Sequence, residues 1–126
     1  MHADGEGAYC ATFHAAVELI GRRWSGAIIQ ALLSGATRFG EVRDLIPDLS
    51  DKMLSDRLKE LETEGIVERI VIPETPVRTE YRLTPKGRDL LEVMREIGAW
   101  AHRWEADASR SAASSTGGRR SAREAG

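Results

Sequence analysis

The chain has 126 residues, of which 41% are apolar and 30% charged, and its formal net charge is -2. This length suits one domain with a single hydrophobic core, and no apolar run approaches the ~20 residues that a membrane-spanning helix needs. The amino-terminal residues lack the basic and apolar regions of a signal peptide, so we expect a cytosolic protein without a membrane partner.

A polar, glycine-containing lead-in, residues 1–9, precedes the first predicted helix. That helix carries one apolar stripe at helical spacing, formed by Phe13, Val17 and Ile20, and it ends at Gly21. We expect this first helix to be short.

Two further helices are predicted before the middle of the chain. The second continues the helical period from Trp24 to Leu32 and stops at Gly35. The third runs from about Arg38 to Ile46, and Pro47 ends it because proline disfavours the helical conformation of the preceding residue. The residues expected to face inward on the third helix are Phe39, Val42, Leu45 and Ile46.

A fourth helix is predicted from Ser50 to Glu64, with Ser50 as its N-cap and Gly65 as a left-handed C-cap. One face of this helix is apolar and consists of Leu54, Leu58 and Leu61. The opposite face carries Lys52, Ser55, Asp56, Lys59 and Thr63. The third and fourth helices, joined by the turn at residues 47–49, are typical of a helix-turn-helix pair.

A two-stranded ribbon follows, predicted over Ile66 to Ile72 and Thr79 to Leu83, where β-branched and aromatic residues are frequent. The six residues from Pro73 to Arg78 contain two prolines and are too many for a two-residue hairpin turn. We therefore expect a projecting wing with Arg78 at its base.

The last predicted helix begins with Thr84 as cap and Pro85 in the first position, and it runs to about Trp104. Its apolar residues span an arc of roughly 180°, which is wider than packing on one partner requires. A homodimer explains this width, and a thick core helix in a monomer is the alternative. The predicted dimer interface consists of Phe13, Val17, Ile20, Met94, Ile97, Trp100, Ala101 and Trp104.

These elements predict a mainly α fold with a small β-ribbon (α+β): a winged helix-turn-helix with added N- and C-terminal dimerisation helices. Residues 10–104 form this domain. Residues 105–126 contain no large apolar side chain and are expected to be a disordered tail, whose arginines could attract phosphate but are more simply solvated.

The motifs between Cys10 and Trp104 resemble those of the HxlR family of bacterial transcriptional regulators. They include MLSDRLKEL at residues 53–61 and EYRLTPKG at residues 80–87, together with the segment from Gly21 to Trp24. The resemblance implies a dimeric winged-helix protein that represses or activates transcription. It also implies that the Ser50 helix enters the major groove of an operator.

The net charge itself does not indicate DNA binding, because DNA-binding domains are often strongly basic. Contact must therefore depend on where the positive groups lie. The expected DNA contacts on the recognition helix are Ser50, Lys52, Met53, Ser55, Asp56, Arg57 and Lys59, and those on the supporting helix and wing are Arg38, Arg43 and Arg78. Asp56 either accepts a hydrogen bond from a cytosine amino group or orients Lys52 or Lys59. Arg57 either reaches the DNA backbone or pairs with an acidic neighbour such as Glu41.

The single cysteine, Cys10, excludes a disulfide within one chain and a zinc site with several thiolates, and we expect neither metal nor cofactor. Cys10 lies near a helix N-terminus and His14, so it is a candidate redox or electrophile sensor. The resemblance agrees, because some HxlR relatives sense oxidants or electrophiles through a cysteine in this segment. Structural packing and a metal site shared by Cys10 and His14 across a dimer are the alternatives.

No phosphate-binding loop or nucleophile motif is present, so we do not expect an enzyme. The alternative function is a winged-helix module for protein contact, with Trp100 and Trp104 as anchors. A small aromatic effector held by Phe13 and these two tryptophans is a further hypothesis, for which core packing is the competing explanation.

Overall fold

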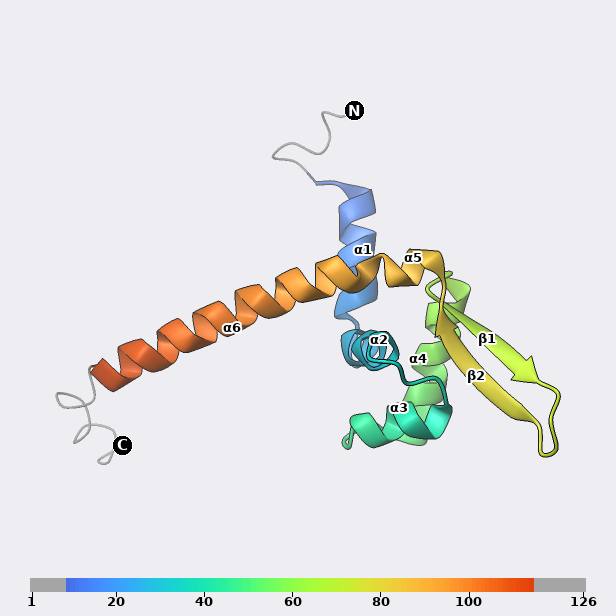
Figure 1. Ribbon diagram of the computed structural model, residues 1–126. Coiled ribbons are helices and arrows are strands. Elements are labelled where there is room, and N and C mark those ends of the chain that lie inside the picture. Colours follow the sequence, from blue (N-terminus) through green and yellow to red (C-terminus); the bar gives the residue numbers. More distant parts are fainter. Residues whose placement is uncertain (1–8, 115–126) are drawn as a thin grey trace. The chain divides into compact units, whose positions relative to one another are not determined.

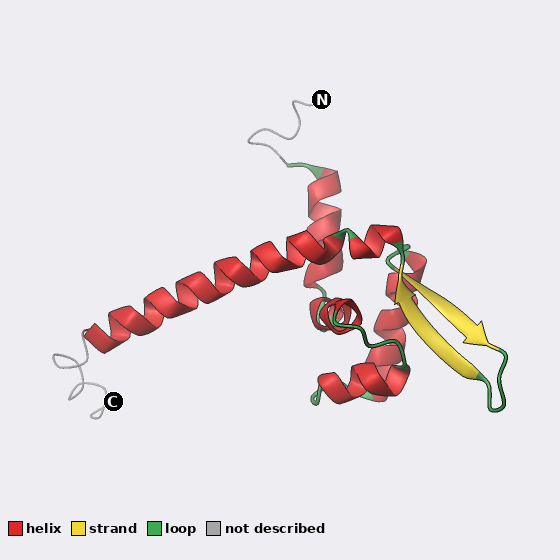
Figure 2. Cartoon of the chain, in the orientation of Figure 1, coloured by secondary structure: helices red, strands yellow, loops and turns green. Residues whose placement is uncertain are grey.

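The computed structural model describes residues 9–114, with side-chain environments through residue 113. The elements are α1 (Ala11–Gly21), α2 (Ser25–Leu33), α3 (Phe39–Leu45), α4 (Asp51–Thr63), β1 (Val67–Ile72), β2 (Arg78–Leu83), α5 (Pro85–Arg88) and α6 (Leu90–Ser114) (Figure 1). Helices predominate over a single antiparallel ribbon (Figure 2), which confirms the predicted fold class. Within residues 9–114, no helix combines the length and the apolar character needed to cross a membrane.

The chain divides into two compact units whose boundary lies inside α6, after Leu91. In the first unit, α2 contacts α1, α3 and α4, and the ribbon contacts α4 through β1. The core residues of this unit are Ile28, Ile29, Ala31, Leu32, Val42, Ile46, Leu49, Leu54, Leu58, Leu61, Ile66, Val67 and Leu83. The described residues of the second unit, 92–114, all belong to α6.

The helix-turn-helix pair consists of α3 and α4, as predicted. Ser50 caps α4, because its side-chain oxygen accepts a hydrogen bond from the Met53 amide at 3.1 Å. Gly65 follows the helix with φ +77°, a conformation that glycine adopts without steric cost. Both ends of the recognition helix are therefore set by local sequence.

The wing is the β1–β2 ribbon, whose register runs from Val67 opposite Leu83 to Ile72 opposite Arg78. Arg78 was expected in the loop, but it is the first residue of β2, so that the loop is residues 73–77. The reason is that Arg78 completes the ladder by pairing with Ile72. The ribbon is tied to the start of α3, because the Tyr81 amide donates to the Thr37 carbonyl at 2.7 Å.

Two predicted details of the helical elements are wrong. Leu45 was expected to face inward, but it is 57% exposed, because Val42 and Ile46 already occupy the core face of the short α3. The single helix predicted from Pro85 to Trp104 is two helices, interrupted at Asp89. The first of these is only four residues long and contains a buried glycine, which weakens a helix.

The helix α6 also continues to Ser114, into the segment 105–126 that was predicted to be disordered. Four alanines between residues 106 and 113, together with an Asp107–Arg110 ion pair one turn apart, favour a helix even though large apolar residues are missing. Residues 115–126 of that predicted tail and residues 1–8 of the lead-in lie outside the described residues.

Gly87 provides a test of the junction between the ribbon and α5. A Cβ atom at this position would fall inside van der Waals contact with the Ile66 carbonyl oxygen and press on the Leu83 side chain. We expect Gly87→Ala to lower the free energy of unfolding by about 1–3 kcal/mol, as overpacking does. Chemical denaturation measures the loss. Gly21→Ala is the control, since no atom lies within 4 Å of its added Cβ, and an equal loss in both variants would contradict the packing.

Candidate nucleic-acid interface

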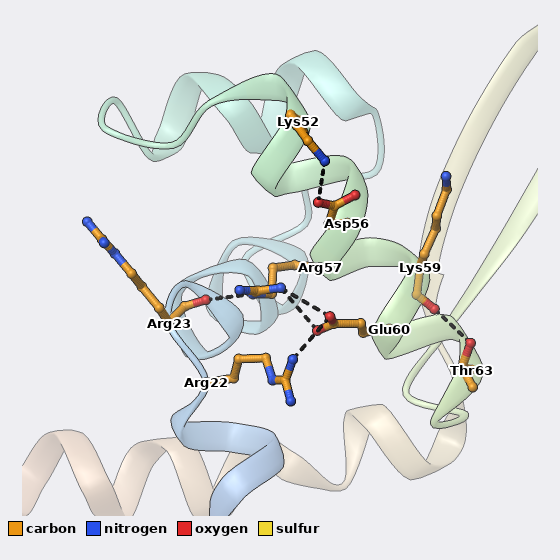
Figure 3. Close-up of polar contacts among 8 residues, drawn as sticks. All are labelled: Arg22, Arg23, Lys52, Asp56, Arg57, Lys59, Glu60 and Thr63. Atoms are coloured by element: carbon orange, nitrogen blue, oxygen red, sulfur yellow. Dashed lines mark hydrogen bonds and ion pairs between the residues drawn. The ribbon is translucent and has the colours of Figure 1, made fainter.

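The leucine stripe of α4 determines which side chains of this helix reach solvent. Leu54, Leu58 and Leu61 are at most 1% exposed, so the opposite side of α4 is turned outward. Lys52 lies on that outer face with 85% of its side chain exposed, and its Nζ is 3.1 Å from Oδ2 of Asp56 (Figure 3). Of the two lysines considered for Asp56, the carboxylate therefore contacts Lys52.

The other predicted contact residues of α4 surround this ion pair. Lys59 is exposed, and no described residue pairs with its ammonium group. Ser55 and Met53 are half-buried, and Ser50 is exposed although its hydroxyl oxygen caps the helix. The outer face therefore offers one oriented lysine, one unpaired lysine and short polar groups.

Two arginines of the supporting helix lie near the turn. Arg43 is 3.4 Å from the Asp51 carboxylate in the first turn of α4 and 3.8 Å from Asp44. Arg38 precedes α3 and is exposed. Both ion pairs of Arg43 are largely exposed to solvent. Exchanging either carboxylate for a phosphate would therefore cost little free energy.

Arg78, the predicted cation of the wing, is held by two carboxylates. Its guanidinium is 3.3 Å from Glu74 and 3.2 Å from Glu80, and only 31% of the side chain is exposed. Arg82 also pairs with Glu80, at 2.8 Å. The local charge at the loop end of the wing is thus mostly compensated.

Arg57 points away from the outer face and is 14% exposed. Its Nε donates to the Arg23 carbonyl at 2.9 Å, and its Nη1 donates to both carboxylate oxygens of Glu60 at 3.1 and 3.2 Å (Figure 3). Glu60 in turn accepts a hydrogen bond from Arg22 at 3.2 Å. The acidic partner of Arg57 is therefore Glu60, and the suggested pairing with Glu41 is wrong.

Glu41 instead caps the start of α3. Its Oε1 accepts hydrogen bonds from the Thr37 amide at 2.9 Å and the Arg38 amide at 3.0 Å. These bonds, first that from Thr37 and then that from Arg38, hold the pKa of the Glu41 carboxyl below its ordinary value of 4.5.

Cys10 is the N-cap residue of α1, and its Sγ accepts a hydrogen bond from the Phe13 amide at 3.5 Å. The thiol is partly exposed, and the His14 amide bonds to the Cys10 carbonyl at 2.9 Å. Among the described residues, no three His, Cys, Asp or Glu side chains gather in a way that could hold a metal ion.

Five of the predicted dimer residues are large exposed apolar side chains, whereas Met94 is buried. On α1, Phe13 is 69% and Val17 is 49% exposed, while Ile20 is half-buried. The remaining residues lie on α6: Met94, Ile97, Trp100, Ala101 and Trp104. Ile97 and the two tryptophans are 48–59% exposed. Exposed apolar side chains of this size make α1 and α6, each by itself, a candidate interaction surface.

A cavity of about 430 Å³ lies between α1 and α4. Its lining residues are Ala15, Glu18, Leu19, Arg22, Glu60 and Glu64. None of the three aromatics proposed to hold an effector belongs to this lining, of which three residues are glutamates.

The sequence predicted no contact for Arg22 or Glu60, and it marked the connector between α1 and α2 only as part of the Gly21 to Trp24 motif. The spacing of Arg57 and Glu60, three residues apart on one helix, was a usable signal for their pairing. No local pattern predicts the bonds from α4 to Arg22 and to the Arg23 carbonyl, since these residues lie more than thirty positions away.

Residues 19–109 match the model of a protein family described as HxlR-like helix-turn-helix. The chain is 50% identical over 95 residues to the uncharacterized HTH-type transcriptional regulator YvaP of Bacillus subtilis, covering 75% of this chain and 88% of that protein. It is 51% identical over 92 residues to the HTH-type transcriptional regulator YodB of the same organism, covering 73% and 82%.

The structure is also similar to the reduced form of B. subtilis YodB, with a TM-score of 0.69 and 50% identity over 74% of this chain and 91% of that one. YodB has likewise been crystallised in a diamide-treated and a quinone-bound form, with TM-scores of 0.67 and 0.66 to this chain.

The lowered pKa of Glu41 predicts a pH-dependent contribution to stability. Because the folded-state pKa is depressed, the contribution is present above the unfolded value and is lost as pH falls through the folded value. We expect Glu41→Gln to be less stable than the wild type at neutral pH, with the difference shrinking below pH 4.5. Thermal denaturation of both proteins between about pH 7 and pH 2 measures this. A stability difference that stays constant over this range would show that the charge on Glu41 does not contribute to stability.

Proposed function

The chain belongs to the HxlR-like helix-turn-helix family, whose curated relatives are transcriptional regulators, and we propose that it represses or activates transcription as a homodimer bound to a pseudo-palindromic operator. Its place of action would be the cytoplasm, on the nucleoid when the operator is occupied. The relatives give no reason to prefer the alternative of a protein-contact module.

The observation that carries this proposal is the outer face of α4. An α-helix fits the major groove of B-DNA, and the amino-terminal half of a recognition helix makes most base contacts. Lys52 lies in that half, and its ammonium group is oriented by Asp56 in the absence of DNA. Lys59 is unpaired within the described residues and can neutralise a phosphate without first losing a partner.

The remaining contacts assigned to DNA are weaker. Ser50, Met53 and Ser55 supply short groups and an apolar side chain beside the lysines, and Arg38 and Arg43 supply phosphate contacts from the supporting helix. Arg78 must exchange Glu74 or Glu80 for a phosphate, so we assign it a smaller share of the affinity than Lys52.

Dimerisation is supported by the exposed stripe on α6. Val93, Ile97, Trp100 and Trp104 follow one another at spacings of four, three and four residues, which is the pattern of a helix packed along a partner helix. The exposed side chains of Phe13 and Val17 on α1 add to the apolar surface. Two protomers would present their α4 helices to major-groove faces about 34 to 36 Å apart.

We also propose that Cys10 senses oxidants or electrophiles. Its thiol is partly exposed at a helix N-terminus, and YodB, a relative of 51% identity, has been crystallised in diamide-treated and quinone-bound forms. Diamide takes two hydrogens from two thiols, which joins Cys10 to a second subunit or to a small thiol. A quinone instead forms a carbon–sulfur bond with the thiol.

The DNA-binding face can be tested with charge-matched variants. Lys52→Gln and Lys59→Gln should each weaken binding to a duplex that the wild type selects from a random pool, and each lost phosphate contact should lower the salt slope by about 0.9. Lys86→Gln is the control, because Lys86 lies on α5 beside the carboxyl end of α4, and Gln retains a donor for the Glu64 carbonyl. Fluorescence anisotropy at several salt concentrations provides both quantities. Unchanged affinity in both lysine variants would remove this face from the interface.

The sensing role of Cys10 can be tested by comparing the wild type with Cys10→Ser before and after diamide treatment. We expect the treated wild type to change its affinity for the selected duplex, because a new bond beside α1 alters the subunit arrangement. The serine variant, which keeps an N-cap oxygen, should not respond. Equal responses in the two proteins would exclude Cys10 as the sensor.

A further inference from the structure

The segment between α1 and α2 combines a strained residue with an unusual set of polar contacts. Trp24 has φ +76°, in the left-handed region that side chains other than glycine rarely adopt, and it is the N-cap residue of α2. A strained backbone conformation of this kind persists only where neighbouring groups hold it in place. The question is which groups hold this connector.

The groups that hold the connector come from the recognition helix, α4. Arg57 donates to the carbonyl of Arg23, the peptide oxygen immediately before Trp24, at 2.9 Å. Glu60 accepts from Arg22 at 3.2 Å and from Arg57 at 3.1 Å, so a single carboxylate joins the connector and α4. We name these four residues, Arg22, Arg23, Arg57 and Glu60, the connector clamp (Figure 3).

Charge and burial distinguish the clamp from an ordinary surface ion pair. Arg57 is 14% exposed, and its planar guanidinium donates to a carbonyl and a carboxylate from two different nitrogens, whereas a lysine carries all its donors on one. A partly buried arginine that lost these partners would leave its charge unsatisfied. The clamp therefore resists small relative movements of α4 and the connector.

We propose that Arg57 and Glu60 are positioning residues of the recognition helix, which lock α4 to the α1–α2 connector so that a movement of α1 reaches the DNA-binding face. This inference rests on the proposed DNA-binding function. It removes Arg57 from the DNA contacts, since its guanidinium is used inside the protein on the flank of α4 away from Lys52 and Lys59.

The variants for a test are Arg57→Gln, Glu60→Gln and their combination. Glu62→Gln is the matched control: it removes the same charge from the same helix, but its side chain takes no part in the clamp. Glu60 is 39% exposed, so Glu60→Gln is a mild change that keeps the test usable if Arg57→Gln fails to fold.

The first measurement needs no DNA. Amide hydrogen exchange at Trp24 and Ser25 in the free protein should quicken by roughly threefold to thirtyfold in the Arg57 and Glu60 variants, and stay unchanged in Glu62→Gln. Exchange rates equal to those of the wild type in both clamp variants would overturn the proposal.

The second measurement is the Kd for the selected duplex, at a temperature where circular dichroism shows each variant folded. Simple charge repulsion predicts that Glu60→Gln and Glu62→Gln both bind DNA more tightly. The clamp predicts instead that Glu60→Gln and Arg57→Gln weaken binding by roughly threefold to thirtyfold, and that the double variant is no weaker than the worse single one.

Each of the following outcomes would contradict either the clamp proposal or the DNA-binding function. A salt slope that falls by about 0.9 in Arg57→Gln, with additive effects in the double variant, would make Arg57 a phosphate contact and overturn the proposal. A lowered Tm with wild-type Kd would make the clamp purely structural and also overturn it. A wild-type protein that selects no duplex would contradict the DNA-binding function, and hydrogen exchange would then decide whether the clamp holds the connector.

Discussion

The burial of three leucines on α4 is the constraint on which the rest of the molecule depends. Leu54, Leu58 and Leu61 are almost completely removed from solvent, and each such burial contributes about 1.5–3 kcal/mol. Rotating the helix about its axis would expose all three at once. The side chains that α4 offers to a partner are therefore determined by its core face, although the protein as a whole is slightly acidic.

Because the core face of α4 is fixed, each of its other sides is available to a different partner. The outer side carries Lys52, Asp56 and Lys59, while Arg57 and Glu60 lie on a flank and bind the connector after α1. One helix thus joins the proposed DNA surface to the segment that follows Cys10 and the exposed stripe of α1. On this account, an event at the amino terminus reaches the operator through the hydrogen bonds of α4 to the Arg23 carbonyl and the Arg22 side chain.

Features encoded by neighbouring residues could be predicted from the sequence. Ser50, Gly65 and the Thr84–Pro85 pair set the ends of helices through contacts within a few residues. The spacing of apolar residues by four and three positions predicted the core face of α4. Features that depend on distant residues could not be predicted from the sequence. The positive φ of Trp24 and the partners of Arg57 arise from tertiary packing, and the continuation of α6 past Trp104 depends on alanine propensity, which an apolar pattern does not record.

The most direct test of the account is methylation protection of guanine N7, a major-groove atom, in the duplex that the wild-type protein selects. The account predicts two protected guanine clusters about one helical turn, or 10 to 10.5 base pairs, apart, each lost when Lys52 and Lys59 are both replaced by Gln. Protection confined to adenine N3 in the minor groove, or guanine protection that survives both replacements, would contradict it.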